Sequence, residues 1–264
     1  MWNEAEKKPV GKYIALTFLI AWGCDAVLIL GERLGLLTGD VGRAVTSLVI
    51  SCGVGFAPAI ALVILMKKYG QIQGAKGFFG RVFATPKVLQ TVVITALFFA
   101  VQVVPNLLSN RYLGNPWYLF ILYMPLMLVV GGIEEIGWRG FFQPALEEKL
   151  PFPVAAALAG VVWAVWHLPL WFIQNAAQAA MNFPAFMCHC VALAFVLAAL
   201  YKLTKSVFAC VALHAWTNVL SGMFTMDTLT SPPDAKLLAF YAVEIAAAVL
   251  IGVFVGRKSI ANAE

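Results

Sequence analysis

Eight long runs of apolar residues set the strongest limit on how this chain can fold. Each run approaches or exceeds the roughly 20 residues that an α-helix needs to cross the hydrocarbon core of a bilayer. The runs cover residues 13–30, 44–66, 88–108, 117–137, 152–173, 183–203, 207–226 and 237–255. The segments between them are short. The pattern therefore predicts an all-α polytopic membrane protein with about eight transmembrane helices, in which residues 1–264 form a single integral membrane domain.

The composition excludes a water-soluble fold. Hydrophobic residues make up 62% of the chain and charged residues only 12%, whereas soluble domains average about 45–50% and about 25%. The net charge is +5, but no stretch interleaves basic and aromatic side chains as a nucleic-acid groove would. We therefore expect the lipid bilayer as a partner and no nucleic acid.

The distribution of lysine and arginine predicts the orientation, because cytoplasmic loops carry an excess of both. With a cytoplasmic N-terminus, 14 of the 18 basic residues fall on the cytoplasmic side: Lys7, Lys8, Lys12, Lys67, Lys68, Lys76, Arg81, Lys87, Arg139, Lys149, Lys202, Lys205, Arg257 and Lys258. The other four are Arg33, Arg43, Arg111 and Lys236. Both termini are predicted to be cytoplasmic. The expected location is the cytoplasmic membrane of a bacterium, or the endoplasmic reticulum membrane if the source is eukaryotic.

A few polar side chains lie inside the apolar runs, where a charge costs about 2.5–3.5 kcal/mol on insertion scales. They are Asp25, Glu134, Glu135, Arg139, His167, His189, His214, Asn218 and Glu244. The five cysteines also lie in apolar runs, and an odd, buried set argues against disulfides. Cys188-His189-Cys190 suggests metal ligands, but neighbours two apart on a helix face different ways. We interpret it as packing.

The segment from Gly131 to Gly140 contains two adjacent carboxylates, which point about 100° apart on a helix and so cannot share one role. Glu135 and Arg139 are four residues apart and can form an ion pair. Glu134 is left without a cation close in sequence and can serve as a general base. Alternatively, the whole cluster only holds two helices together.

Two further pairs lie one helical turn apart. Trp163 and His167 share a face, and Pro169 should disrupt the helix just beyond them, which frees a backbone carbonyl that can orient the His167 ring. His214 and Asn218 share a stripe and can donate two hydrogen bonds to an oxygen that develops negative charge. The alternatives are a packed histidine in the first pair and a contact between helices in the second.

Taken in order, Glu134-Glu135-x-x-x-Arg139, Trp163-x-x-x-His167 and His214-x-x-x-Asn218 resemble the CPBP family. This family of intramembrane proteases, also called Abi, comprises the CAAX-type prenyl-protein endoproteases and bacteriocin-processing or immunity proteins. The three motifs lie within residues 131–218. Position 163 departs from the family pattern, which more often has Phe there.

The resemblance implies that the chain is an endopeptidase, with a role for each motif residue. Glu134 and His167 would activate a water, His214 and Asn218 would stabilise the oxyanion, and the supporting residues would be Glu135, Arg139 and Trp163. The family has been described both as metalloproteases and as glutamate proteases. Glu134, His167 and His214 are candidate zinc ligands, but the chain lacks a His-Glu-x-x-His motif. The sequence leaves two alternatives, no cofactor or a divalent metal such as zinc, and we favour a reaction without a metal.

The expected substrate is a membrane-associated peptide, either of prenylated CAAX type or bacteriocin-like, which enters a cavity open to the cytoplasm. One alternative is a proton-coupled transporter whose relay groups are Asp25, Glu134, Glu135 and Glu244. The other is a non-catalytic bacteriocin-immunity protein.

The predicted spans also conflict in depth, because Glu134 lies near the end of the fourth span, whereas His167 lies about 22 Å into the fifth.

Overall fold

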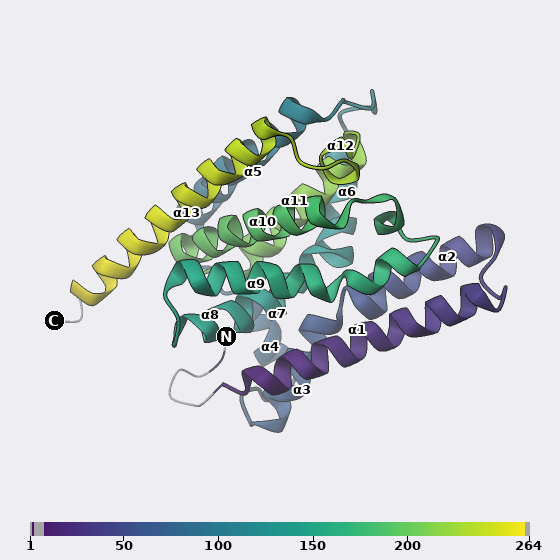
Figure 1. Cartoon of the computed structure of the whole chain (residues 1–264). Coiled ribbons are helices and arrows are strands. Elements are labelled where there is room, and N and C mark those ends of the chain that lie inside the picture. Colours follow the sequence, from purple (N-terminus) through teal and green to yellow (C-terminus); the bar gives the residue numbers. More distant parts are fainter. Residues whose placement is uncertain (1, 3–7, 262–264) are drawn as a thin grey trace.

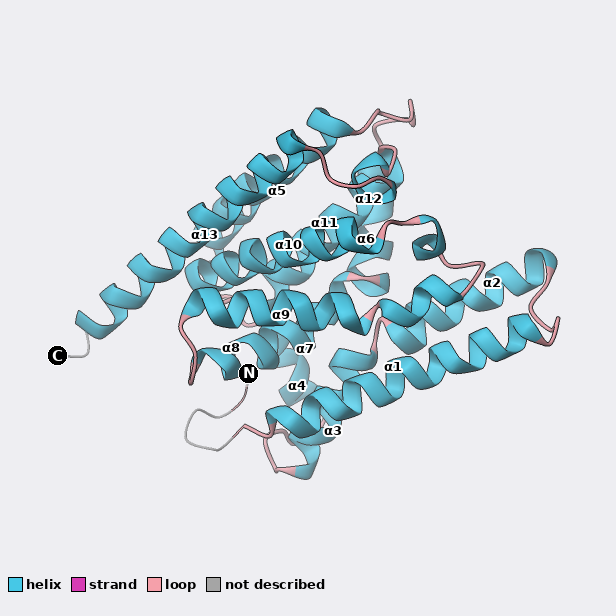
Figure 2. Ribbon diagram, in the orientation of Figure 1, coloured by secondary structure: helices cyan, strands magenta, loops and turns pink. Residues whose placement is uncertain are grey.

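The computed structural model describes residue 2 and residues 8–261, and helices make up nearly all of its regular structure (Figure 2). The α-helices are α1 (Val10–Arg33), α2 (Gly39–Val49), α3 (Ala57–Lys68), α4 (Ala75–Val82), α5 (Val88–Ser109), α6 (Leu119–Val130), α7 (Glu135–Gly137), α8 (Gln143–Glu147), α9 (Phe152–Trp166), α10 (Phe183–Thr204), α11 (Val207–Met223), α12 (Asp227–Thr230) and α13 (Ala235–Ala261). Short 3₁₀ and π segments join several of them: η1 (Ile50–Val54), η2 (Gly132–Glu134), η3 (Trp138–Phe142), η4 (Leu168–Phe172) and η5 (Ala177–Ala180).

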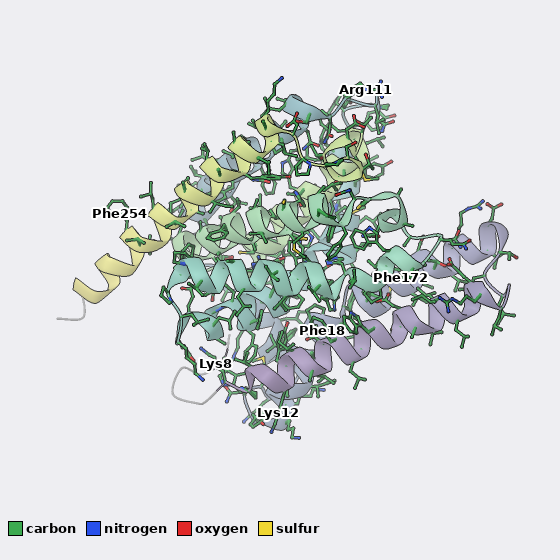
Figure 3. The ribbon with its side chains drawn as sticks, viewed as in Figure 1. Lys8, Lys12, Phe18, Arg111, Phe172 and Phe254 are labelled. Atoms are coloured by element: carbon green, nitrogen blue, oxygen red, sulfur yellow. The ribbon has the colours of Figure 1, made fainter. Side chains whose placement is uncertain are left out.

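The predicted membrane spans are confirmed. Seven segments are long and apolar enough to cross a bilayer, and they are Val10–Arg33, Gly39–Lys68, Val88–Ser109, Leu119–Glu147, Phe152–Phe172, Phe183–Thr204 and Ala235–Val255. The eighth, Val207–Met223, has the same character but only 17 residues. Large apolar side chains such as Phe172 and Phe254 stay exposed on the outside of the bundle (Figure 3), as lipid contact allows. The chain is an integral membrane protein with multiple spans.

The centre of the bundle is α10, the most deeply buried of these spans, which packs against α9 on one side and α13 on another. Small residues permit this contact, as they commonly do between transmembrane helices. A Cβ at Gly160 of α9 would lie 2.7 Å from the Cα of Val191 on α10. α11 packs against α10, α5 and α6, and so joins the central helix to the fourth span.

The predicted end of the fourth span is wrong. The sequence places that end at residue 137, but the span continues through η2, α7, η3 and α8 to Glu147. Arg139, predicted as a cytoplasmic residue, is buried inside the bundle with 1% of its surface exposed. Glu135 and Arg139 pair with each other, so the segment that carries these charges can stay inside the membrane. The extension places Glu134 near the middle of the span and removes the conflict in depth.

Both ends of the chain lie at the same end of the bundle: α1 begins and α13 ends toward the left of the view in Figure 1. Lys8 and Lys12 lie at this end and Arg111 at the other (Figure 3). This arrangement agrees with an even number of crossings. Lys7 and the side chains of Arg257 and Lys258 lie outside the described part of the chain. Which end faces the cytoplasm stays a prediction.

Candidate active site

Two glycines bring the acidic motif against α11. α6 ends at Val130, and Gly131 and Gly132 lead into the 3₁₀ turn that ends at Glu134. A Cβ at Gly131 would lie 2.0 Å from Nδ2 of Asn218, and one at Gly132 would lie 2.4 Å from the carbonyl oxygen of Val211. Only glycine permits so close an approach. The backbone next to Glu134 therefore touches the helix that carries His214 and Asn218.

Glu135 is the centre of a buried ionic cluster. Its Oε2 lies 2.9 Å from Nη1 of Arg139, and its Oε1 lies 2.9 Å from Nδ1 of His214. The three side chains are 0%, 1% and 5% exposed. An ionised carboxylate only accepts hydrogen bonds, so Nδ1 of His214 carries the proton and Nε2 is left without this partner. The predicted pair of Glu135 and Arg139 is confirmed, but the bond to His214 joins elements that sequence spacing does not relate.

Trp163 holds the other carboxylate. Its indole Nε1 donates to Oε2 of Glu134 at 2.9 Å, and its ring lies 5.2 Å from the His214 ring and 5.7 Å from the His167 ring, centre to centre. Sequence spacing identified Trp163 only as a neighbour of His167. The signal for its second role is chemical, since a buried indole N–H needs an acceptor. Trp163 therefore connects Glu134 to both histidines.

The end of α9 orients His167. Its backbone N–H bonds to the carbonyl of Ala164 at 3.2 Å, so the carbonyl of Trp163 is free to accept from Nδ1 of His167 at 2.9 Å. The chain then continues as a 3₁₀ turn that contains Pro169. The predicted backbone partner for this ring is confirmed, and it is the carbonyl of Trp163. Because a carbonyl only accepts, Nδ1 carries the proton and Nε2 of neutral His167 keeps a lone pair.

One cavity of about 380 Å³ contains all four predicted catalytic residues in its lining, namely Glu134, His167, His214 and Asn218. Trp163 lines it as well, whereas Glu135 and Arg139 do not. The lining also includes His189 of α10, which the sequence predicts only as a packed residue. Its Nδ1 lies 3.3 Å from the hydroxyl of Tyr241. The sequence does not indicate that His189 faces the cavity, because this depends on how α10 is rotated about its axis.

The cavity extends toward the end of the bundle opposite the chain termini. Its outer lining includes Asn175, Gln178 and Met181 from the loop after α9, and Met226 and Leu229 from the α12 region. In Figure 1 this loop and α12 lie away from the end that holds both termini. The part of the cavity that these loop residues line is therefore at the opposite end from Val10, where α1 begins.

The candidate metal ligands do not form a metal site. In the described part of the chain, no group of three or more His, Cys, Asp or Glu side chains is arranged to hold a metal ion. This holds for Glu134, His167 and His214, although all three line the cavity. All five cysteines are free thiols, as the sequence predicts, and Cys188 and Cys190 take part in no such group.

Two other intramembrane carboxylates lie apart from the cavity. Asp25 is fully buried in α1, and Glu244 of α13 is 8% exposed and accepts a 2.5 Å hydrogen bond from Nε2 of Gln102. Neither belongs to the lining that holds Glu134. The four carboxylates of the transporter alternative, with Glu135 among them, therefore do not follow one continuous cavity.

Comparison with known proteins finds similarity over the segment that contains the three motifs. The sequence model of the Rce1-like family, described as type II CAAX prenyl endopeptidase Rce1-like, matches residues 115–220. A CAAX prenyl protease 2 of Methanococcus maripaludis is 30% identical over 135 residues, which cover 46% of this chain and 50% of that protein. The chain thus spans about half the length of this relative. Residues 115–220, which contain all three motifs, thus resemble the Rce1-like type II CAAX prenyl endopeptidases.

Proposed function

We propose that this chain is an intramembrane endopeptidase that hydrolyses a peptide bond with a water activated by Glu134 and His167. The observation that carries the proposal is that Glu134, His167, His214 and Asn218 line one cavity inside the bundle. Their positions come from three separate spans, α6–α8, α9 and α11. Similarity to the Rce1-like type II CAAX prenyl endopeptidases, over the segment that contains all four residues, supports the same reaction.

The first step is attack by water. Oε2 of Glu134 accepts from Trp163, so Oε1 is available to take a proton from water while Nε2 of His167 accepts the second water hydrogen. The water oxygen adds to the substrate carbonyl carbon, and the carbonyl oxygen becomes an oxyanion. The proton held by Glu134 then passes to the leaving nitrogen as the C–N bond breaks. The oxyanion re-forms the carbonyl, and the products are one carboxylic acid and one amine. The proton of the acid then passes to the amine, which leaves a carboxylate and an ammonium group.

The second group of side chains stabilises the oxyanion. Nδ2 of Asn218 supplies one N–H, and Nε2 of His214 supplies another when the ring is doubly protonated. Glu135 accepts from Nδ1 of this ring at 2.9 Å and balances its charge. Removing one such donor typically costs about 100-fold or more in kcat. Glu135 and Arg139 act as positioning residues, because neither lines the cavity.

We propose that the reaction passes through these side chains without a metal ion. The arrangement of Glu134, His167 and His214 supports this, since they form no metal-holding group. Dialysis of the purified protein against a strong zinc chelator should leave the cleavage rate unchanged. A rate that falls on chelation and returns on addition of Zn²⁺ would overturn this part of the proposal.

The substrate we propose is a membrane-associated peptide with a prenylated CAAX tail. The family description and the name of the Methanococcus relative support this class. A bacteriocin-like peptide is the alternative substrate. Both peptides can be supplied to the protein in proteoliposomes and the products identified by mass spectrometry, so that the preferred class is measured directly.

The decisive test compares Glu134→Gln with Glu244→Gln in the same assay. Both residues are buried intramembrane carboxylates, but only Glu134 lines the cavity. We expect Glu134→Gln to abolish cleavage with unchanged thermal unfolding, and Glu244→Gln to keep it. Cleavage retained by Glu134→Gln would overturn the assignment. Biological rescue by that inactive variant would instead favour a non-catalytic immunity protein, and ion-driven uptake into proteoliposomes would favour a transporter.

A further inference from the structure

A second, smaller cavity lies beside the candidate active site, between α5, α10, α11, α12 and α13. Its volume is about 30 Å³, and nine of its thirteen lining residues are polar although most of them come from transmembrane helices. The polar members are Gln102, Asn106, Asn110, His189, Thr217, Ser221, Thr225, Thr228 and Tyr241. Polar side chains that face one another inside a membrane protein mark paths for water, protons or ions.

Only a thin wall separates this polar pocket from the catalytic cavity. Five residues line both: His189, Thr217, Ser221, Met226 and Leu229. Three of the five are polar, and they come from α10 and α11. Thr217 directly precedes Asn218, the proposed oxyanion donor. Its hydroxyl donates to the carbonyl of His214, three residues earlier, at 2.8 Å. A water at this wall would lie beside the residues that perform the proposed chemistry.

The outer part of the pocket is held by hydrogen bonds between side chains near the loops. Nδ2 of Asn110 lies 2.8 Å from Oδ1 of Asn106 and 3.2 Å from the hydroxyl of Thr228, and the Thr228 N–H donates to Oδ1 of Asn110 at 2.9 Å. Pro105 also faces the pocket, and as a proline it donates no backbone bond to Val101. The pocket thus has a fixed polar frame that reaches the end of the bundle opposite the termini.

The size of the pocket suits water. A buried water needs about 10–15 Å³ of such volume and two to four polar partners, so about 30 Å³ holds about two waters. Each hydrolysis consumes one water, and a membrane-embedded substrate seated in the 380 Å³ cavity would displace the water held there. The enzyme then needs a supply that the substrate does not block.

We propose that the pocket framed by Asn106, Asn110 and Thr228 stores water and delivers it to Glu134 past His189, Thr217 and Ser221. This proposal rests on the proposed peptidase function, because the water it supplies is the one consumed in hydrolysis. It adds Asn106 of α5 and His189 of α10 as positioning residues, and both lie outside the three motifs.

The water itself can be detected without any cleavage. In proteoliposomes, brief radiolysis converts bound water to hydroxyl radicals, which oxidise side chains that touch it. Tyr241 lines the pocket and is 6% exposed, so it is an internal reporter. Met66, fully buried in α3 and in the lining of neither cavity, is the control. We expect oxidation of Tyr241 but not of Met66, and reduced oxidation in Asn106→Leu, which fills the pocket with an apolar group of similar size.

The supply role is tested by kinetics on the same variants. Asn106→Leu and Thr217→Val should lower kcat by about tenfold with little change in KM, because Asn106 lies outside the substrate cavity and Thr217→Val keeps the volume of its side chain. Thr95→Val is the matched control, since Thr95 also bonds a carbonyl of its own turn but lines neither cavity. Unoxidised Tyr241, or kcat values equal to that of Thr95→Val, would overturn the proposal. No cleavage by the unaltered protein, with Tyr241 still oxidised, would overturn the peptidase function and the supply role with it.

Discussion

At the scale of single residues, the chemistry of the site depends on which atoms are left free once the protein's own bonds are made. Oε2 of Glu134 and Nδ1 of His167 bond to Trp163, and Nδ1 of His214 bonds to Glu135. The second oxygen of Glu134 and Nε2 of each histidine are left free of these bonds. The motif spacing identifies these residues but not their partners. The positions of free atoms are therefore a result of packing between helices.

Trp163→Phe tests the bond that holds Glu134. It removes the donor at 2.9 Å from Oε2 and keeps an aromatic ring at the position. A hydrogen bond to a charged group contributes about 1.5–3 kcal/mol, so kcat should fall by about tenfold or more while KM stays close to its original value. Because the aromatic ring is kept, part of the activity should persist. Unchanged kcat would show that the indole N–H does not position the carboxylate.

Arg139→Leu tests the buried ion pair. It leaves Glu135 ionised inside the bundle without its cation, and breaking such a pair costs about 3–5 kcal/mol of stability. Arg43→Leu is the control, since the pair of Arg43 and Asp40 is exposed and such pairs contribute about 0–1 kcal/mol. The free energy of unfolding, measured by denaturant titration in mixed micelles, should separate the two variants. Equal losses would contradict the view that Glu135 depends on Arg139.

At the scale of helices, the site exists because the fourth span changes its winding. The 3₁₀ turn at Gly132–Glu134 and the π segment at Trp138–Phe142 lie within it. Such segments often mark functional sites. Glu134 and Glu135 lie at the first of these segments and contact different partners: Trp163 for Glu134, and Arg139 and His214 for Glu135.

Gly131→Ala tests the close approach of this span to α11. The added Cβ would lie 2.0 Å from Nδ2 of Asn218, so either that amide or the turn that carries Glu134 must move. A displacement of about 1 Å can cost roughly 100-fold in rate, and we expect a loss of that size. Gly80→Ala is the control, because its Cβ would meet nothing within 4 Å. Full activity of Gly131→Ala, with Gly80→Ala also active, would contradict the proposed tight packing.

The sequence predicted whole helices well and their ends less well, for a physical reason. Average hydropathy over about 20 residues reports burial in lipid, so the eight runs correspond to eight apolar spans, two of which are built from several α-helices. It does not report charges that pair inside the protein. The predicted fourth span therefore ends at residue 137, ten residues before its end in the structure at Glu147. The polar pocket was not predicted, because it requires Asn106, Thr217 and Tyr241 from three helices to meet.

At the scale of the whole molecule, two predictions from the sequence conflict. The part of the cavity lined by Asn175, Gln178 and Met226 lies at the end of the bundle opposite the termini. Cytoplasmic termini would therefore place this part of the cavity on the non-cytoplasmic side. With Arg139 now inside the bundle, 13 basic residues remain assigned to the end that holds the termini and four to the other. This bias favours cytoplasmic termini, and we infer that this part of the cavity lies on the non-cytoplasmic side.

Labelling of single cysteines decides the orientation. Ala179, exposed in η5 beside this part of the cavity, and Lys68, exposed at the end of α3, are suitable sites once the five native cysteines have been replaced. In intact cells a membrane-impermeant maleimide should modify Ala179→Cys at once and Lys68→Cys only after the membrane is permeabilised. The reverse result would place the termini outside and this part of the cavity on the cytoplasmic side. Modification of both in intact cells would contradict the fold itself, because the two positions lie at opposite ends of the bundle.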